Sequence, residues 1–275
     1  MIRKILKLLI ILFSMVLASL GLCHREIEHT THYEPRDYNE IMESGVIRAV
    51  TEYNSFSYHV ADDTIEGFDY DLLQAYAQSH GLRVEITPEM SYHNRIKGVT
   101  SGRYDLLAKS TLVTKHSRDS LLFTSTLFLS KQVLVQRKSL PQHDSTFVSS
   151  PMQLHGKTIH LVKDSPALLR VRNMIDEMAD TVYIQEVDKY GPEQLISMVA
   201  EGDIDYAVCD ERTASRGAKE YNNIDISTDI SFTQFYAWGM NLQSATLCDS
   251  INAWLQLYTA TKEYRELCKK YKVGK

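Results

Sequence analysis

Cysteines are few in this chain of 275 residues, and their spacing excludes the sites that cysteines most often build. Besides Cys23 near the start, only Cys209, Cys248 and Cys268 are present, and no two of them form a Cys-x-x-Cys pair. A disulfide framework would need more cysteines, and zinc or redox sites need close pairs. Cys209 falls within an apolar run and is expected to be a small buried side chain. Cys248 and Cys268 could pair in an oxidising compartment.

Basic clusters with interleaved aromatic residues are also missing. Without Arg3, Lys4 and Lys7, which belong to the first 22 residues, the 30 basic residues fall to 27 against 35 acidic ones, a net charge of −8. This balance argues against a nucleic-acid partner. The histidines show no metal-ligand spacing and no nearby nucleophile motif, so we expect no metal and no cofactor. The histidines considered are His116, His143, His155 and His160.

The sequence has one long hydrophobic run, residues 8–22, which is too short to span a membrane comfortably. Because a positively charged segment precedes this run, residues 1–22 are predicted to be a secretory signal. Residues 18–23 resemble a bacterial lipobox, although Leu22 stands where a small residue is usual. Cys23 is therefore predicted to be lipidated and to anchor the protein in the cell envelope. An ordinary cleaved signal and an uncleaved anchor are the alternatives.

Two ten-residue stretches, one hundred positions apart, have the same pattern: residues 101–110 (SGRYDLLAKS) and residues 201–210 (EGDIDYAVCD). In each, a glycine ends a helix-like segment and an aspartate precedes a short apolar run, which is typical of a buried parallel strand. In open α/β sheets, ligands bind beyond the carboxyl ends of the strands. Ser110 and Asp210 are therefore predicted to face one cleft from two related halves. The alternative is that these are two ordinary helix-glycine-strand units.

Hydrophobic periodicity predicts alternating strands and helices along most of the chain, and this alternation indicates βαβ units on mostly parallel sheets. The predicted strands cover residues 47–51, 82–86, 104–108, 131–138, 158–162, 181–184, 206–209 and 230–240. The predicted helices cover residues 68–81, 92–100, 166–178, 192–201, 247–257 and 262–271.

This order predicts an α/β fold with two lobes, each a mostly parallel sheet flanked by helices. The chain is expected to cross between the lobes near residues 132–136 and again near residues 232–236. Lobes joined by two short strands can close around a ligand by hinge motion. A single doubly wound domain is the alternative. The predicted boundaries are 23–38 for a lipidated tether, 39–134 with 234–275 for lobe 1, and 135–233 for lobe 2.

A series of short motifs resembles solute-binding protein family 3, the periplasmic receptors for polar amino acids. The resemblance covers nearly all of the chain beyond the tether, and it implies the two-lobe, type II periplasmic-binding-protein fold. The motifs are residues 47–51 (IRAVT), 67–72 (GFDYDL), 102–105 (GRYD), 123–124 (FT), 154–158 (LHGKT), 202–206 (GDIDY) and 270–271 (KY).

Within this family, residues 51–58 (TEYNSFSY) and 205–211 (DYAVCDE) most resemble the sensor-like domain of membrane-bound lytic transglycosylase F. In that enzyme a lysozyme-like domain follows and cuts peptidoglycan. Here the chain stops where the binding unit ends, so we expect no transglycosylase activity and no enzyme.

The resemblance also implies roles for individual residues. Asp210 matches the aspartate that pairs with the ligand's amino group, and it could instead, or as well, be a helix N-cap. Ser110 matches a position whose hydroxyl or amide meets the ligand. Ser165 matches part of a phosphate-loop-like turn that holds the carboxylate, although Pro166 removes one amide donor from that turn.

The family's carboxylate-binding arginine has no direct match, because Ser117 occupies its position and Arg118 follows one residue later. A one-residue shift of the loop would restore Arg118 to the site. Without that shift, the site would suit a peptide or a cell-wall fragment better than a free α-carboxylate, and Arg118 would be a surface residue. Tyr53, Phe56 and Tyr58 could form an aromatic wall against the ligand, or pack the lobe.

Together these features predict a monomeric envelope lipoprotein that closes its lobes on a small polar ligand, such as an amino acid, a short peptide or a cell-wall fragment. It would serve transport with an ABC permease, or sensing alongside cell-wall enzymes. The alternatives are a transglycosylase-F-like regulator, a structural lipoprotein with a vestigial cleft, and a dehydratase-type enzyme that uses a cleft acid such as Glu52.

Overall fold

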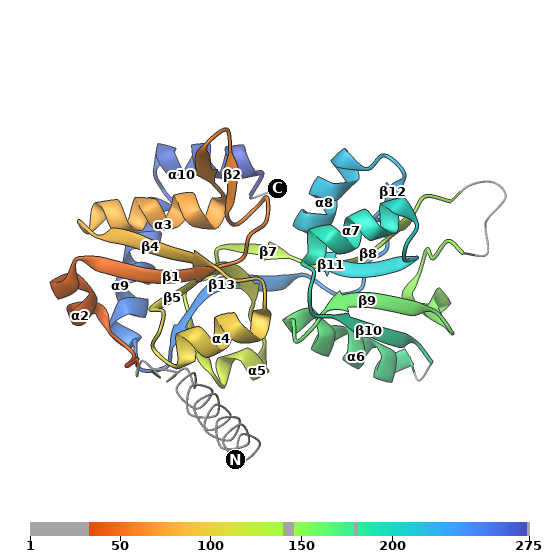
Figure 1. The fold of residues 1–275 in the computed structure, drawn as a ribbon, viewed down its shortest axis with the longest axis horizontal. Helices are drawn as coiled ribbons and strands as arrows, with labels where there is room; N and C mark the ends of the chain where they lie inside the picture. Colours follow the sequence, from red (N-terminus) through yellow and green to blue (C-terminus); the bar gives the residue numbers. More distant parts are fainter. Residues whose placement is uncertain (1–32, 140–145, 179–180, 274–275) are drawn as a thin grey trace, which may run out of the picture. The chain divides into compact units, whose positions relative to one another are not determined.

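A computed structural model of the chain describes residues 33–139, 146–178 and 181–273. These residues form two large β-sheets flanked by helices, together with one short hairpin (Figure 1). The predicted signal, Cys23 and residues 24–32 lie outside the described residues. In the part of the chain that the structure describes, no helix is long and apolar enough to cross a membrane.

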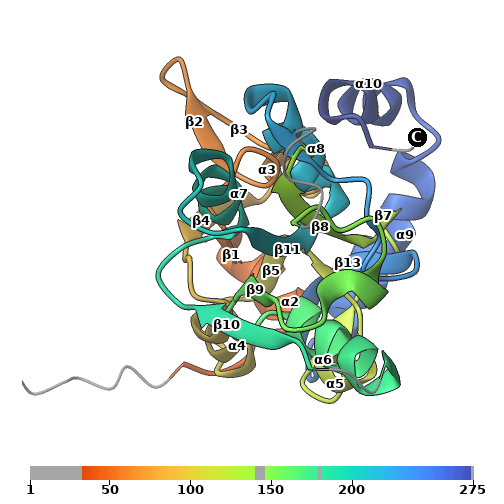
Figure 2. The same ribbon diagram turned by 90° about the vertical axis from the view of Figure 1, so that its right-hand side faces the viewer.

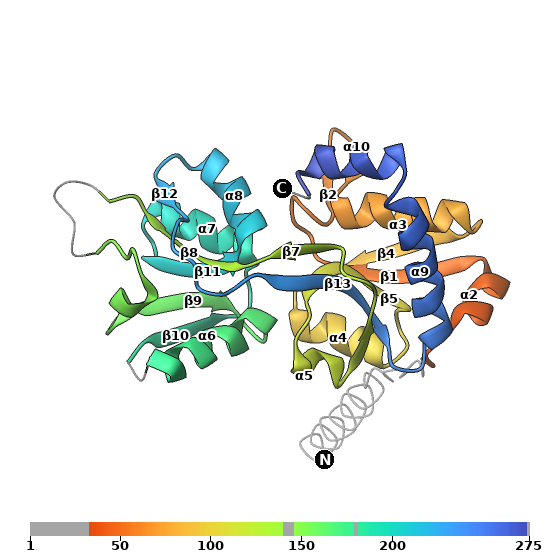
Figure 3. The same cartoon turned by 180° about the vertical axis from the view of Figure 1, so that it is seen from behind.

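The first sheet has the strand order β4-β1-β5-β13-β6, and β7 also pairs with β13. Strand β1 runs parallel to β4 and to β5, as βαβ connections require. Strand β13 returns from late in the sequence and lies antiparallel to β5, β6 and β7 (Figure 3). The strands are β1 (Val46–Thr51), β4 (Arg83–Pro88), β5 (Leu106–Leu112), β6 (Leu121–Phe123), β7 (Phe128–Ser130) and β13 (Gln234–Asn241), with β2 (His59–Ala61) and β3 (Thr64–Glu66) forming the hairpin. The accompanying helices are α2 (Tyr38–Ser44), α3 (Phe68–Ser79), α4 (Tyr92–Thr100), α5 (Lys115–Arg118), α9 (Ala245–Tyr258) and α10 (Lys262–Tyr271).

The second sheet has the order β10-β9-β11-β8-β12. Strand β9 is parallel to β10 and β11, whereas β8 is antiparallel to both β11 and β12. The strands are β8 (Gln132–Arg137), β9 (Thr158–Val162), β10 (Tyr183–Val187), β11 (Tyr206–Asp210) and β12 (Ile224–Asp225). The helices are α6 (Pro166–Met178), α7 (Pro192–Glu201) and α8 (Glu211–Glu220), with a short 3-10 turn, η1, at Pro151–Leu154.

Side-chain alternation along the central strands explains why helices cover both faces of each sheet. In β5, Leu106 packs into the core formed with α3, α9 and α10, whereas Leu107 packs on the other face with Val99 of α4. In β11, Val208 joins the core next to α6, and Cys209 joins the core next to α7 and α8. Because both faces of these strands are buried, successive residues along them are apolar rather than alternately apolar and polar.

The chain passes between the two sheets at two neighbouring places. The first lies at Lys131, between β7 and β8, and the second lies in the segment between β12 and β13. The Gln132 backbone amide donates to Ser231 Oγ at 2.9 Å, and Gln132 Nε2 donates to the Tyr236 hydroxyl at 2.6 Å. These bonds hold the two connecting segments side by side.

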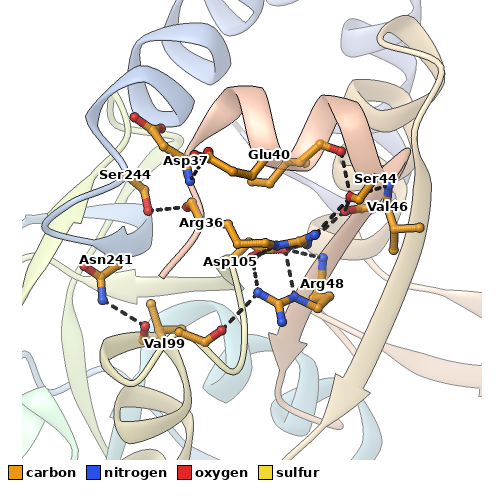
Figure 4. A network of polar contacts seen from close by, with 12 residues as sticks. Arg36, Asp37, Glu40, Ser44, Val46, Arg48, Val99, Asp105, Asn241 and Ser244 are labelled. Atoms are coloured by element: carbon orange, nitrogen blue, oxygen red, sulfur yellow. Dashed lines mark hydrogen bonds and ion pairs between the residues drawn. The ribbon is translucent and has the colours of Figure 1, made fainter. Parts of the chain in front are cut away.

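Asp105, the aspartate of the first repeated stretch, is the centre of a polar network that joins residues before β1 to the first sheet (Figure 4). It accepts hydrogen bonds from the Arg36 guanidinium at 2.5 and 3.0 Å and from Arg48 Nη2 at 2.7 Å. It also accepts a bond from the Arg48 backbone amide at 2.7 Å. Ser244, which precedes α9, donates to the Arg36 carbonyl at 2.8 Å. The aspartate that precedes the apolar run of the first repeated stretch thus makes a buried ionic contact.

Most of the predicted elements are confirmed, and the α/β fold with two sheets replaces the alternative of one doubly wound sheet. The sheets are mixed rather than mostly parallel, because β13 and β8 pair antiparallel with their neighbours. Strand β5 differs, because it runs two residues beyond Ser110, where antiparallel pairing with β13 extends it. The β-like run predicted from residue 230 becomes strand β13 only at Gln234. Cys209, Cys248 and Cys268 are all free thiols, and Cys209 is buried as predicted.

Candidate functional site

A small cavity of about 100 Å³ lies between elements of the two sheets, close to the carboxyl ends of β1, β9 and β11. This is the location that open α/β sheets favour for ligands. One wall comes from β1, α4 and β5, the other comes from β9, α6 and β11, and the connecting segments contribute Gln132 and Tyr236. The polar or charged lining residues are Glu52, Tyr92, Arg95, Lys109, Ser110, Thr111, Gln132, Ser165, Asp210 and Tyr236.

The structure brings Ser110 to this cavity, but its side chain already has a partner in the protein. Ser110 is 2% exposed, and its hydroxyl donates to Asp69 Oδ1 at 2.5 Å. The same Asp69 oxygen accepts from the Ser110 amide at 3.0 Å and from Trp238 Nε1 at 2.7 Å. Burial raises the pKa of Asp69, although Lys109 and these hydrogen bonds oppose the shift. Ser110 therefore lies within the strand rather than at its end, and its hydrogen bonds hold Asp69, the first aspartate of the GFDYDL motif.

Asp210 ends β11 and lines the same cavity from the second sheet. Its Oδ1 accepts from the Arg212 amide at 3.0 Å, so it caps helix α8. Its Oδ2 is buried and has no partner in normal hydrogen-bond geometry among the described residues. The neighbouring Tyr236 hydroxyl has a pKa well above its ordinary value, first because it is buried and next because of the Asp210 charge. Asp210 thus interacts with the Tyr236 hydroxyl, and a ligand donor that binds Oδ2 would share this oxygen with Tyr236.

Glu52 and Arg95 form a buried ion pair in the wall of the cavity. Arg95 Nη2 lies 2.7 Å from Glu52 Oε2, and Asn54 Nδ2 donates to Glu52 Oε1 at 2.8 Å. Burial raises the pKa of Glu52, but the charges of Arg95 and Lys109 outweigh it, so that the pKa lies below its ordinary value. An ionised carboxylate with both oxygens occupied is a poor proton donor, which weighs against Glu52 as the acid of a dehydratase.

Lys109 is one of the lining residues that the sequence reasoning missed. It lies half-buried in β5, next to Ser110, and its ammonium makes one long hydrogen bond, 3.4 Å to the Ser110 carbonyl. Among the described residues it has no ion pair within 4.0 Å. A lysine within a largely buried strand was the available signal, because burying an ammonium costs energy unless it has a partner.

A second cavity, of about 490 Å³, shares Tyr92, Ser165 and Pro166 with the first and therefore adjoins it. Ser165 precedes α6 and lines both cavities. Tyr92 is the aromatic side chain common to both, and burial raises its pKa to about 12. The remaining lining residues include Thr114, His116, Ser117, Asp164 and Arg172.

Arg118 is not brought to either cavity. It ends the short helix α5 with an exposed side chain, while Ser117 turns toward the second cavity. Thr114 and Ser117 form a reciprocal capping box, with the Ser117 amide donating to Thr114 Oγ1 at 3.0 Å and the Thr114 amide donating to Ser117 Oγ at 2.9 Å. These bonds fix the register of α5 without the one-residue shift that would bring in Arg118.

The three aromatic residues after β1 also lie apart from both cavities. Phe56 is buried in the core of the first sheet, stacked on Phe68 at a centroid distance of 5.2 Å. Tyr53 and Tyr58 contact each other edge to face at 6.3 Å, and Tyr53 is 46% exposed. Tyr92 takes the place at the cavity that the sequence reasoning gave to these residues.

Within the described residues, no group of three or more His, Cys, Asp or Glu side chains is placed to hold a metal ion. The polar groups of the cavity are suited to binding a small charged molecule, with a carboxylate and an ammonium contributed from different sheets.

Comparison with known sequences finds relatives named membrane-bound lytic murein transglycosylase F. The chain is 23% identical over 228 residues to membrane-bound lytic murein transglycosylase F of Photobacterium profundum, a match covering 83% of this chain and 43% of that protein. It is 30% identical over 216 residues to the Desulfosudis oleivorans protein of the same name, covering 78% of this chain and 45% of the relative. The chain thus spans less than half the length of these relatives.

Comparison of structures shows the same fold in amino-acid-binding proteins. A mutant of ArgBP from T. maritima superposes with a TM-score of 0.74 at 19% identity, covering 85% of this chain and 97% of that one. The substrate-binding protein AbpA of a Streptococcus pneumoniae amino acid ABC transporter, bound to L-arginine, gives a TM-score of 0.71 at 22% identity, covering 86% and 100%. These neighbours show the type II periplasmic-binding-protein fold, as predicted.

The family model of the bacterial extracellular solute-binding proteins, family 3, matches residues 46–274, which include both sheets and both walls of the cavity. The chain therefore belongs to family 3 of the bacterial extracellular solute-binding proteins.

Proposed function

We propose that this protein is an envelope solute-binding protein that closes two lobes over one small zwitterionic ligand, an amino acid or an amino-acid-bearing fragment such as a short peptide or a muropeptide. One observation carries this proposal. Asp210, whose Oδ2 has no partner in normal hydrogen-bond geometry among the described residues, and Lys109, which has no ion pair among them, line one cavity from different sheets. A ligand with an ammonium and a carboxylate complements both groups.

In this proposal, each charged group of the ligand contacts a different residue of the protein. The ligand's ammonium donates to Asp210, because charge-assisted hydrogen bonds to a carboxylate are among the strongest available. The ligand's carboxylate contacts Lys109, which takes the part that the family pattern gives to an arginine at Ser117. Tyr92 packs against the apolar part of the ligand.

The adjoining cavity supports a ligand larger than one free amino acid. It extends from Ser165 and Tyr92 to the α5 side and is several times larger than the first cavity. A peptide or a muropeptide stem would place its charged end at Lys109 and Asp210 and its remainder in this adjoining space. The transglycosylase F relatives favour such a cell-wall fragment, and hence sensing, over transport with an ABC permease.

Closure would move residues 39–134 with 234–275 as one lobe and residues 135–233 as the other. Direct hydrogen bonds bridge these two groups of residues. Ser55, in the loop after β1, donates to Glu193 Oε1 of α7 at 2.5 Å through its hydroxyl and at 3.0 Å through its amide. Arg216 of α8 also donates to the Ser55 carbonyl. Such bonds can break and form as the lobes open and close.

The test is a thermal-shift screen of L-amino acids, dipeptides and muropeptides, followed by calorimetry on the wild type and on Asp210→Asn. The variant should bind the best ligand about ten- to a hundredfold more weakly, because one charge-assisted hydrogen bond is lost. Its melting temperature should barely change, because Asn caps a helix nearly as well as Asp.

Lys109→Met should weaken binding of the same ligand, while an Asp188→Asn variant, changed on an exposed residue away from the cavity, should bind normally. Equal affinity of the wild type and Asp210→Asn, combined with a lowered melting temperature, would make Asp210 a helix cap only and would refute the proposal.

We further propose that lipidated Cys23 anchors the protein as a monomer in the envelope. Cys23→Ala should release the protein from the membrane fraction or leave it unprocessed, because no thiol is left to receive the lipid. Metabolic labelling with a fatty acid measures this directly, and undiminished label in the variant would reject the lipid anchor.

A further inference from the structure

A strongly basic groove of about 590 Å³ lies between α8 and the end of α10, separate from the two cavities described above. Figure 2 shows the two helices on the same side of the molecule, and Figure 1 shows α10 over the first sheet and α8 over the second. We call it the α8–α10 groove. It is lined by five cationic residues, Arg212, Arg216, Lys219, Lys270 and Lys272, together with Ser55, Phe56, Glu211, Ser215 and Tyr271.

The helical spacing of α8 explains how the cations gather on one wall. Arg212, Arg216 and Lys219 are separated by four and three positions, so they lie on one face of the helix. The opposite wall comes from the end of α10 and the residue after it, where Lys272 adopts a left-handed backbone with φ of 57°. A helix of the second sheet and a helix of the first sheet thus present like charges to one space.

The available acids neutralise only part of this charge. Glu211, the one acid of the lining, lies 3.6 Å from Lys131, outside the groove. Lys270 is paired with Glu66 at 3.3 Å and with Asp71 at 3.2 Å. Neither Lys219 nor Lys272 has an acid within 4.0 Å among the described residues, and both are exposed.

The two unpaired lysines are also close to each other. The pKa of Lys219 is lowered, first through its contact with Lys272 and further by slight burial and the neighbouring positive charges. Arg212 adds a buried Nε without a hydrogen-bond partner, while its other nitrogens donate to the Lys272 and Leu129 carbonyls. Like charges held this close in an acidic protein are stabilised by an anion that contacts both.

We propose that the α8–α10 groove binds a phosphate-type oxyanion, with the Lys219 and Lys272 ammonium groups as its direct contacts and the Arg216 guanidinium behind them. A tetrahedral, multiply charged anion offers several acceptor oxygens, which matches donors that arrive from two walls. The groove is concave and limited in size, and the chain is acidic overall, so a small phosphate ester or a phosphorylated headgroup fits better than nucleic acid.

Calorimetric titration of the full chain with inorganic pyrophosphate at low salt tests the site. Lys219→Gln with Lys272→Gln should weaken binding at least tenfold, because both direct contacts lose their charge. The matched control, Lys189→Gln with Lys262→Gln, removes the same charge from exposed lysines outside the groove and should stay within about twofold of the wild type. Thermal melts of both double variants check that each is folded.

Two further arms separate the possible sources of the phosphate. Saturable binding of glycerol phosphate that depends on Lys219 and Lys272 would assign the groove to soluble esters. Flotation with phosphatidylglycerol vesicles, but not with phosphatidylcholine vesicles, and with the same dependence, would assign it to a headgroup. No saturable binding of pyrophosphate, glycerol phosphate or vesicles, or equal weakening by both double variants, would overturn the proposal.

Discussion

Replacing Asp105 by alanine should lower the free energy of unfolding by about 3–5 kcal/mol, the usual cost of removing one partner of a buried ion pair. The Asp105 side chain is fully buried and contacts both Arg36 and Arg48 (Figure 4). Its loss leaves two arginines, each about one-fifth to one-quarter exposed, without a counterion, and it leaves the Arg48 amide without an acceptor. The segment before β1 would lose this ionic attachment to the sheet.

The chain offers a matched control at the equivalent position of the second repeated stretch. Asp205 pairs with Arg137, but its side chain is 65% exposed. Asp205→Ala should therefore cost less than about 1 kcal/mol, as exposed ion pairs usually do. Urea denaturation followed by tryptophan fluorescence measures both variants. Losses of similar size for the two aspartates would show that burial of the Asp105 pair is not what makes it strong.

The repeated stretches show how far the sequence could predict this fold. Both glycines, Gly102 and Gly202, end their helices with positive φ angles of 78° and 90°, as the pattern indicated. The glycine of the GFDYDL motif is also explained, because a Cβ on Gly67 would lie 2.2 Å from the Ser57 carbonyl oxygen. The positive φ of a glycine that ends a helix depends on a few adjacent residues, so local sequence reveals it, whereas the close approach of Ser57 to Gly67 involves a segment ten positions earlier.

The candidate site was only partly predictable, because its remaining residues depend on contacts that are distant in the sequence. Asp210 and Ser165 lie at the cavity, but Ser110 is bound to Asp69 and Arg118 stays outside. Strand β5 is buried on both faces, so alternation could not show which way Lys109 points. The α4 residue Arg95 reaches the cavity only because its partner Glu52 follows β1. No local pattern encodes such a pairing.

The second large effect on stability is expected at the buried ion pair of Glu52 and Arg95. Arg95→Met should lower the free energy of unfolding by about 3–5 kcal/mol near neutral pH, because Glu52 stays buried without its cation. The side chains of Arg95 and Glu52 are only 4% and 7% exposed. Adding Glu52→Leu to Arg95→Met should recover part of the loss, because no charge is then left buried. The recovery is incomplete because the buried Asn54 amide loses its acceptor, Glu52 Oε1. This double variant also controls for the Arg95 bonds to the Glu89 and Met90 carbonyls, which both variants lack.

The pH dependence separates lost charge from lost packing. In the wild type the pKa of Glu52 lies below its ordinary value, so the pair contributes stability above that value and loses it as the pH falls through the folded-state pKa. In Arg95→Met the burial that raises the pKa is no longer outweighed by Arg95, so the folded protein takes up a proton at higher pH than the unfolded chain does. The free-energy cost of burying ionised Glu52 without Arg95 is then complete near neutral pH, and it shrinks as the solution is acidified. The difference in the free energy of unfolding between the wild type and Arg95→Met should therefore narrow as the pH falls. Urea denaturation from about pH 7 down to about pH 4 measures this difference. A gap that stays constant over this range would show that the arginine stabilises the cavity wall through packing, and not through its charge.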